Sequence, residues 1–166
     1  MTEPTSAPPR DEPITAGEQA PLFELPAVLD GGEQVTVSLG AELAKGPVLL
    51  VFYADDGMPL CTTQLSVFAQ ESPTLREAGV EIFAINTNGL GSHAKFHERD
   101  HFPFPLISDF HGDVVKAYGL WNPAGQKSFR AAIVIEPSGV IKHVELHFNP
   151  RNINAVVAVF DALGLG

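Results

Sequence analysis

The stretch at residues 48–66 most restricts what this chain can fold into. It opens with six apolar residues, 48–53, mostly β-branched or aromatic, which predicts a strand buried on both faces. Polar and helix-breaking residues at 55–59 end that strand, and a helical apolar pattern follows. Cys61, the only cysteine among 166 residues, falls where the loop becomes the helix. The first turn of a helix has free N–H groups and a partial positive charge, so this position favours a thiolate.

The rest of the chain predicts alternating strands and helices. We expect further strands at 23–25, 35–37, 80–86, 106–108, 131–135 and 140–146, and further helices ending near 78, at 92–101, at 113–118 and after 149–150. Ser92 is the expected N-cap of one helix, and Pro150 the first residue of the last. The last helix is expected to bury Ile153, Val156, Val157, Phe160 and Leu163.

This order of elements predicts a fold class. The turn at residues 30–32 makes an N-terminal β-hairpin, and the turn at 136–139 joins two antiparallel strands near the end. Parallel βαβ units lie between the two hairpins. The sequence therefore predicts an α/β, thioredoxin-like sandwich, with a mixed central sheet flanked by helices and an N-terminal β-hairpin extension.

Length and charge set the class of protein. A chain of 166 residues supports one domain, which we place at residues 18–166. Residues 1–17 are polar and proline-rich, which predicts a disordered tail. The net charge of −10 argues against binding to nucleic acid or to an anionic membrane. We find no apolar signal segment or membrane-spanning run, and a lone cysteine suits a reducing compartment, so we expect a cytoplasmic protein.

A thiol in this position needs help to ionise at neutral pH. Lowering a thiol pKa from about 8.5 to about 6 requires roughly 3.5 kcal/mol, whereas a helix terminus contributes about 0.3–1 kcal/mol. Asp55 and Asp56 oppose ionisation if they lie close to Cys61. Arg130 is the best candidate for a compensating cation, because it directly precedes the apolar strand at 131–135. The plainer alternatives are a buried core role for Cys61 and a surface ion pair for Arg130.

Together these residues resemble a peroxiredoxin of the alkyl hydroperoxide reductase and thiol-specific antioxidant superfamily. The resemblance is to the bacterioferritin-comigratory (Q) type, with the one-cysteine E type close behind, and it covers about residues 18–163. Its pieces are Ala20-Pro21-x-Phe23-x-Leu25, Phe52-Tyr53, Asp56-x-x-Pro59-x-Cys61-Thr62-Thr63, Phe104-Pro105-Leu106-Ile107-Ser108-Asp109, Tyr118-Gly119 and Arg130 before its strand.

The resemblance implies an activity and roles for residues. The family's thiolate attacks a peroxide oxygen, giving an alcohol or water and a sulfenic acid that a second thiol reduces. Cys61 then corresponds to the peroxidatic cysteine and Arg130 to the arginine that stabilises the thiolate and polarises the peroxide. Gln64 falls where the family often has a supporting Glu. No cofactor or metal is implied, and the partners are a peroxide and an external thiol, with a homodimer left open.

Three positions depart from the family pattern. The motif Pro-x-x-x-Thr-x-x-Cys has Ala54 at its proline and Met58 at its threonine. A thioether cannot donate the hydrogen bond that the threonine hydroxyl provides. Ser66 stands where the Q type often has its resolving cysteine, so the external thiol must be a thioredoxin, a glutaredoxin, a low-molecular-weight thiol or a thiol of another chain.

Two functions compete at this point. The first is a one-cysteine, thiol-dependent peroxidase that reduces hydrogen peroxide or organic hydroperoxides, favoured by the presence of both Cys61 and Arg130. The second is a peroxiredoxin-like scaffold or slow redox sensor that has lost efficient activity, favoured by Ala54 and Met58. His93, His97 and His101 share one helix face, which we interpret as solvated rather than metal-binding.

Overall fold

The structure, a computed structural model, describes residues 4–165; residues 1–3 of the expected tail and Gly166 of the expected domain lie outside the described residues. Its strands are β1 (Glu24–Val28), β2 (Gln34–Ser38), β3 (Val48–Phe52), β4 (Glu81–Asn86), β5 (Leu106–Ser108), β6 (Trp121–Asn122), β7 (Lys127–Ser128), β8 (Ala131–Ile135) and β9 (Ile141–Leu146). Its helices are α1 (Leu39–Leu43), α2 (Pro59–Gln70), α3 (Ser72–Glu77), α4 (Leu90–Asp100), α5 (Asp113–Ala117) and α6 (Ile153–Ala162).

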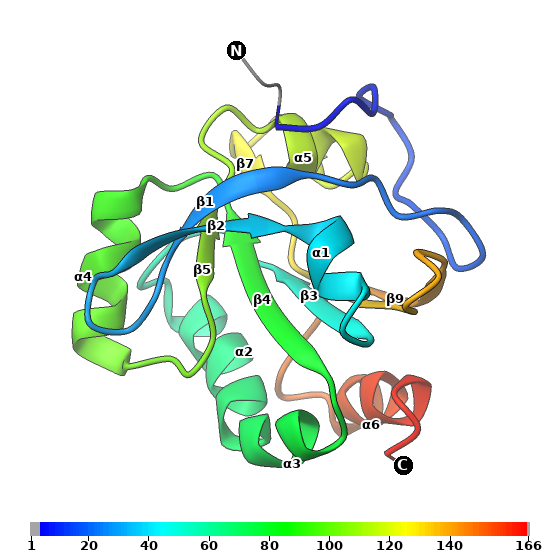
Figure 1. Ribbon diagram of the computed structural model, residues 1–166. Coiled ribbons are helices and arrows are strands. Elements are labelled where there is room, and N and C mark those ends of the chain that lie inside the picture. The colour runs from blue at the N-terminus through cyan, green and yellow to red at the C-terminus, as the bar shows by residue number, and fades with distance from the viewer. Residues whose placement is uncertain (1–3, 166) are drawn as a thin grey trace.

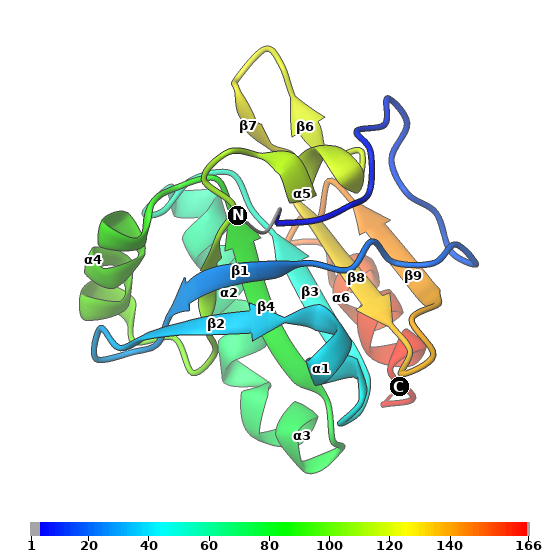
Figure 2. The same cartoon turned by 45° about the horizontal axis from the view of Figure 1, so that its top comes forward.

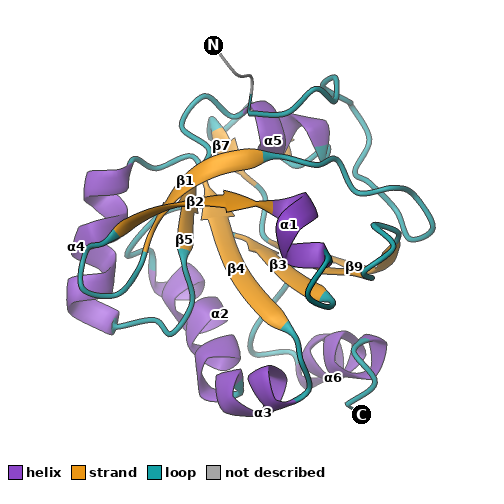
Figure 3. Cartoon of the chain, viewed as in Figure 1, coloured by secondary structure: helices purple, strands orange, loops and turns teal. Residues whose placement is uncertain are grey.

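Seven of the strands form one mixed sheet, in the order β2-β1-β5-β4-β3-β8-β9 (Figures 1 and 3). β3 runs parallel to β4, and β4 runs parallel to β5, whereas β8 lies antiparallel to β3 and to β9. The predicted N-terminal hairpin is β1–β2, and it joins the sheet through antiparallel pairing of β1 with β5. This arrangement confirms the predicted α/β sandwich with a mixed central sheet.

The central position of β3 follows from its composition. All five of its residues are fully buried, and successive side chains point to opposite faces. Leu49 and Val51 pack with the core that α2, α3, α4 and α6 cover, whereas Val48, Leu50 and Phe52 pack with the core beneath α1 and α5. Figure 2 shows β3 inside the sheet between β4 and β8. The loop that carries Cys61 therefore starts from the most constrained part of the molecule.

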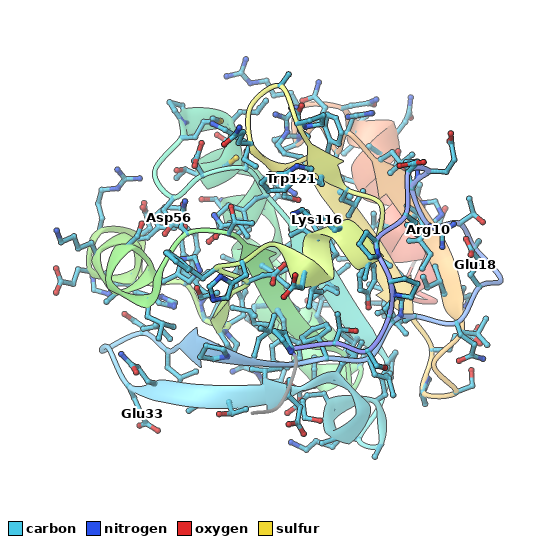
Figure 4. The ribbon with its side chains drawn as sticks, turned by 90° about the horizontal axis from the view of Figure 1, so that it is seen from above. Arg10, Glu18, Glu33, Asp56, Lys116 and Trp121 are labelled. Atoms are coloured by element: carbon cyan, nitrogen blue, oxygen red, sulfur yellow. The ribbon has the colours of Figure 1, made fainter. Side chains whose placement is uncertain are left out.

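Residues 4–17 differ from the expected disordered tail. The Ile14 side chain is 1% exposed and belongs to the core, and its N–H donates to the Tyr118 carbonyl at 3.0 Å. Arg10 forms an ion pair with Glu18 at 2.8 Å, visible in Figure 4. Gly119, with φ of 71°, allows close packing here, because a Cβ atom at this residue would lie 2.1 Å from the Glu12 carbonyl oxygen. The proline-rich composition of this segment gave no signal that Ile14 is buried in the core.

Two helix starts also differ from the expectations. The N-cap of α4 is Gly89 rather than Ser92, which lies inside the helix and uses its hydroxyl elsewhere. The N-cap of α6 is Asn152, whose side chain accepts from the N–H of Asn154, so Pro150 precedes the helix.

The expected buried stripe of α6 is partly wrong. Ala155 and Val159 are its buried residues, whereas Ile153 is 68% exposed and Val157 is 45% exposed. Val156, Phe160 and Leu163 are partly buried and pack against the core, as expected. No helix within residues 4–165 is long and apolar enough to cross a membrane.

Candidate active site

Cys61 lies in the first turn of α2, directly beyond the end of β3. Met58 occupies the N-cap position with an extended backbone, and Pro59 begins the helix, where its missing N–H costs nothing. No side chain caps this end of the helix. The Cys61 side chain is completely buried. The thiol therefore lies at a helix N-terminus, in a position shielded from bulk water.

Two groups contact the Cys61 sulfur, and both belong to positions that depart from the family pattern. The backbone N–H of Ala54 donates to Sγ at 3.4 Å. The Sγ thiol in turn lies 3.7 Å from the Met58 Sδ atom and donates to it. A thioether is a weak acceptor and has no donor, so Met58 cannot orient a peroxide oxygen by donating to it.

Gln64 connects the cysteine helix to the central strand. Its side chain is fully buried, and its Nε2 atom donates to the Phe52 carbonyl at 3.1 Å. Its Oε1 atom has no partner within the described residues. Gln64, one turn after Cys61 in α2, therefore links this helix to the end of β3.

Arg130 lies at the same end of the sheet as the cysteine loop. Phe52 pairs with Ala131 across β3 and β8, so Arg130 is carried next to the residues that follow Phe52. It is partly buried, and its Nε atom donates to the Phe148 carbonyl at 3.3 Å. Within residues 4–165 no hydrogen bond or ion pair joins its guanidinium to Cys61, so its contact with the thiolate stays a prediction.

Asp56 is the centre of a polar cluster that holds the cysteine loop. Its Oδ1 atom accepts from the Tyr53 hydroxyl at 2.6 Å and from the Asn86 amide at 3.3 Å. Its Oδ2 atom accepts from the Ser92 hydroxyl and from His93 Nδ1, both at 2.7 Å. Burial alone would raise the pKa of Asp56, but the hydrogen bonds and the charge of His93, with the hydroxyl donors, hold that pKa below its ordinary value. Figure 4 shows Asp56 beside α4.

Both acidic residues of the loop have a basic partner. His93 is fully buried, and its Nε2 atom lies 3.0 Å from the Ile107 carbonyl oxygen. Both ring nitrogens therefore face oxygen acceptors, and Nδ1 lies against the Asp56 carboxylate. Asp55 forms an ion pair with Lys127. Each of the two carboxylates that sequence reasoning set against a thiolate therefore has a basic side chain beside it.

The interpretation of the three histidines as a solvated face is wrong for His93 and His97, whereas His101 is exposed. His93 and His97 point into the protein, and His97 Nε2 donates to the Val28 carbonyl at 2.9 Å. Burial lowers the pKa of His97, which favours the neutral ring. His101 ends α4 in a left-handed conformation and contacts Asp30. Sequence periodicity missed the inward direction because two buried polar side chains look like a polar face. Residues 4–165 contain no group of three or more His, Cys, Asp or Glu side chains that could hold a metal ion.

Comparison with known proteins places this geometry in a family. The model of the AhpC/TSA family matches residues 16–144. Peroxiredoxin Bcp of Escherichia coli K12 is 32% identical over 87% of this chain and 94% of its own length. The selenocysteine-containing peroxiredoxin PrxU of Peptoclostridium acidaminophilum is 29% identical over 92% of this chain and 78% of its own length.

A solved structure supports the same assignment. Peroxidoxin BcpB of Mycobacterium tuberculosis superposes with a TM-score of 0.78 and 26% identity, over 91% of this chain and 97% of that one. Its fold is the thioredoxin-like fold described above. The strand, loop and helix that present Cys61 are thus part of a known architecture, and the chain belongs to the AhpC/TSA family, as a peroxiredoxin of the Bcp type.

Proposed function

We propose that this thiol-dependent peroxidase uses Cys61 as its peroxidatic residue. The Cys61 thiolate attacks one oxygen of a hydroperoxide, the O–O bond breaks, and the leaving oxygen takes a proton to give an alcohol or water. Cys61 becomes a sulfenic acid. The observation that supports this most is the single buried thiol in the first turn of α2, hydrogen-bonded through its sulfur in a peroxiredoxin fold.

Arg130 is the proposed source of positive charge for the reaction. Its strand register brings it to the end of β3, and a guanidinium carries several donors that suit both a thiolate and a peroxide oxygen. Its hydrogen bond to the Phe148 carbonyl uses only Nε, so the terminal nitrogens remain available as donors to a thiolate or a peroxide. The hydrogen peroxide or organic hydroperoxide is bound between this cation and the sulfur.

Reduction of the sulfenic acid requires an external thiol, because Cys61 is the only cysteine of the chain. The first thiol condenses with the sulfenic acid, releases water and leaves a mixed disulfide. A second thiol then attacks that disulfide and restores Cys61. Thioredoxin, glutaredoxin or a low-molecular-weight thiol fits this role. Since Sγ is completely buried, the first turn of α2 must open for the reductant to reach it.

The second candidate function is a scaffold or slow redox sensor. Met58 in place of a threonine and the complete burial of Cys61 favour it. In that case Cys61 would react with peroxide no faster than a free cysteine.

A cytoplasmic location and a homodimer, which would cover the 67% exposed Phe110, remain predictions.

Turnover tests the peroxidase directly. The wild-type protein should consume hydrogen peroxide or cumene hydroperoxide catalytically when dithiothreitol or a thioredoxin system is supplied, and only stoichiometrically when no thiol is present. The Cys61→Ser protein should match the background in both assays. Peroxide consumption that stays at background for the folded wild type, with every reductant, would favour the scaffold.

A further inference from the structure

The backbone N–H of Ala54 differs from the preceding backbone N–H in its hydrogen-bond acceptor, which is a sulfur atom. The preceding N–H, of Tyr53, donates to the Ile85 carbonyl at 3.2 Å and continues the pairing of β3 with β4. One residue later the pairing ends, and the Ala54 N–H points at Cys61 Sγ instead, at 3.4 Å. Both groups are buried, so water does not compete for this hydrogen bond.

The surrounding contacts fix the direction of this N–H. Tyr53 is fully buried, and its hydroxyl donates to Asp56 on the far side of Ala54. The Asp56 N–H donates to Asn88 Oδ1 at 2.8 Å. Ala54 is thus held between two anchored residues, and Gln64 fixes the facing helix to Phe52. The N–H is preorganised toward the sulfur before any peroxide arrives.

This donor exists only because the residue is not proline. At residue 54 the family pattern has a proline, which carries no N–H. The chain therefore gains a donor to the sulfur at one departed position and loses a hydroxyl donor at the other, Met58. Because both residues form hydrogen bonds with Sγ, the two departures bear on the same atom.

We propose that the Ala54 N–H is a catalytic hydrogen-bond donor to the Cys61 sulfur. This donor stabilises the thiolate and replaces part of the contact that the family's threonine hydroxyl provides. The inference rests on the proposed role of Cys61. A hydrogen bond to an anionic acceptor is stronger than one to a neutral acceptor, so the contact favours the thiolate over the thiol. It also holds the attacking lone pair in a fixed direction.

The proposal predicts that restoring the family residue alone will harm the site. Ala54→Pro removes the N–H, so the pH profile of iodoacetamide alkylation should move to higher pH and the rate at pH 7 should fall about tenfold. Ala54→Gly is the matched control, because it changes the side chain and keeps the N–H, and its profile should move much less than that of Ala54→Pro. An unchanged profile in Ala54→Pro, or an equal shift in Ala54→Gly, would overturn the proposal.

A double-variant cycle gives a second readout. Met58→Thr should raise the peroxide rate constant more in the Ala54→Pro background than in the wild type, since the hydroxyl then replaces a donor that is absent. Equal gains in the two backgrounds would show that residues 54 and 58 act independently, against the proposal.

The wild-type protein provides a measurement that does not depend on the folding of a variant. In amide NMR spectra recorded across the titration of the thiol, the Ala54 N–H signal should shift strongly, whereas that of Tyr53 should not. An Ala54 signal that moves no more than that of Tyr53 would refute the hydrogen bond. Alkylation and NMR involve no peroxide, so they test Ala54 even if the wild-type peroxide rate shows that the proposed function is wrong.

Discussion

Replacing Arg130 by alanine is expected to slow the reaction of Cys61 with hydrogen peroxide by about 10²–10³-fold, the usual cost of one preorganised electrostatic contact. Asp55 already lies against Lys127, and Asp56 against His93, so neither carboxylate needs Arg130 as its partner. We therefore expect the removal of Arg130 to act on the thiolate and on the leaving oxygen. Stopped-flow fluorescence or competition kinetics measures the rate constant.

Arg130→Lys is the matched control for the charge. It keeps the positive charge but loses the planar array of donors, so its rate should fall between those of the wild type and Arg130→Ala. The alkylation profile of Arg130→Ala should also move to higher pH, and that of Arg130→Lys much less. If Arg130→Ala reacts as fast as the wild type, the guanidinium serves only to hold the Phe148 carbonyl, which follows β9, beside the start of β8.

The second large effect is a gain. Met58→Thr is expected to increase the peroxide rate constant, by up to about 10²-fold, because it places a hydroxyl donor where the thioether now lies 3.7 Å from Sγ. The alkylation profile should change much less than the peroxide rate, since a hydroxyl is neutral. Met58 packs at the edge of the core, so the shorter side chain should also lower the thermal midpoint slightly.

Met58→Val distinguishes the effect of the added hydroxyl from the effect of the smaller side chain. Valine has nearly the shape of threonine but no donor, so any gain that it produces comes from removing the bulk of methionine above the buried thiol. We expect Met58→Val to react at a rate close to that of the wild type and well below that of Met58→Thr. Equal gains in the two variants would mean that Met58 limits access to Cys61, and that orientation of the peroxide is supplied by another group.

Much of the fold was predictable because hydrophobic periodicity reports burial. The central strand, the two hairpins and the cysteine helix follow from apolar runs and turn residues, and the structure confirms them. The start of α6 and the inward direction of His93 were not predictable. The start of α6 is set by a local cap, in which the Asn152 side chain accepts from the Asn154 N–H, and Pro150 gave the stronger sequence signal. A buried histidine needs partners from distant elements, here Asp56 and Ile107.

The candidate site was predictable in its residues rather than in its contacts. Cys61 is unique in the chain, and its place after an apolar strand indicates a helix N-terminus. Ala54 and Met58 attract attention only as departures from a motif, and the sequence cannot show that both touch the sulfur. The pairing of Asp55 with Lys127 joins residues far apart in the chain, so no local pattern reveals it.

The central claim, that Cys61 is peroxidatic, is tested most directly by the mass of the intact protein after one equivalent of hydrogen peroxide. We predict that one oxygen is added within seconds, that it is trapped on Cys61 by a sulfenic-acid reagent, and that excess peroxide adds a second oxygen to give the sulfinic acid. The Cys61→Ser protein should gain neither. An unmodified wild-type mass after seconds, with oxidation only at the slow rate of a free cysteine, would contradict the account.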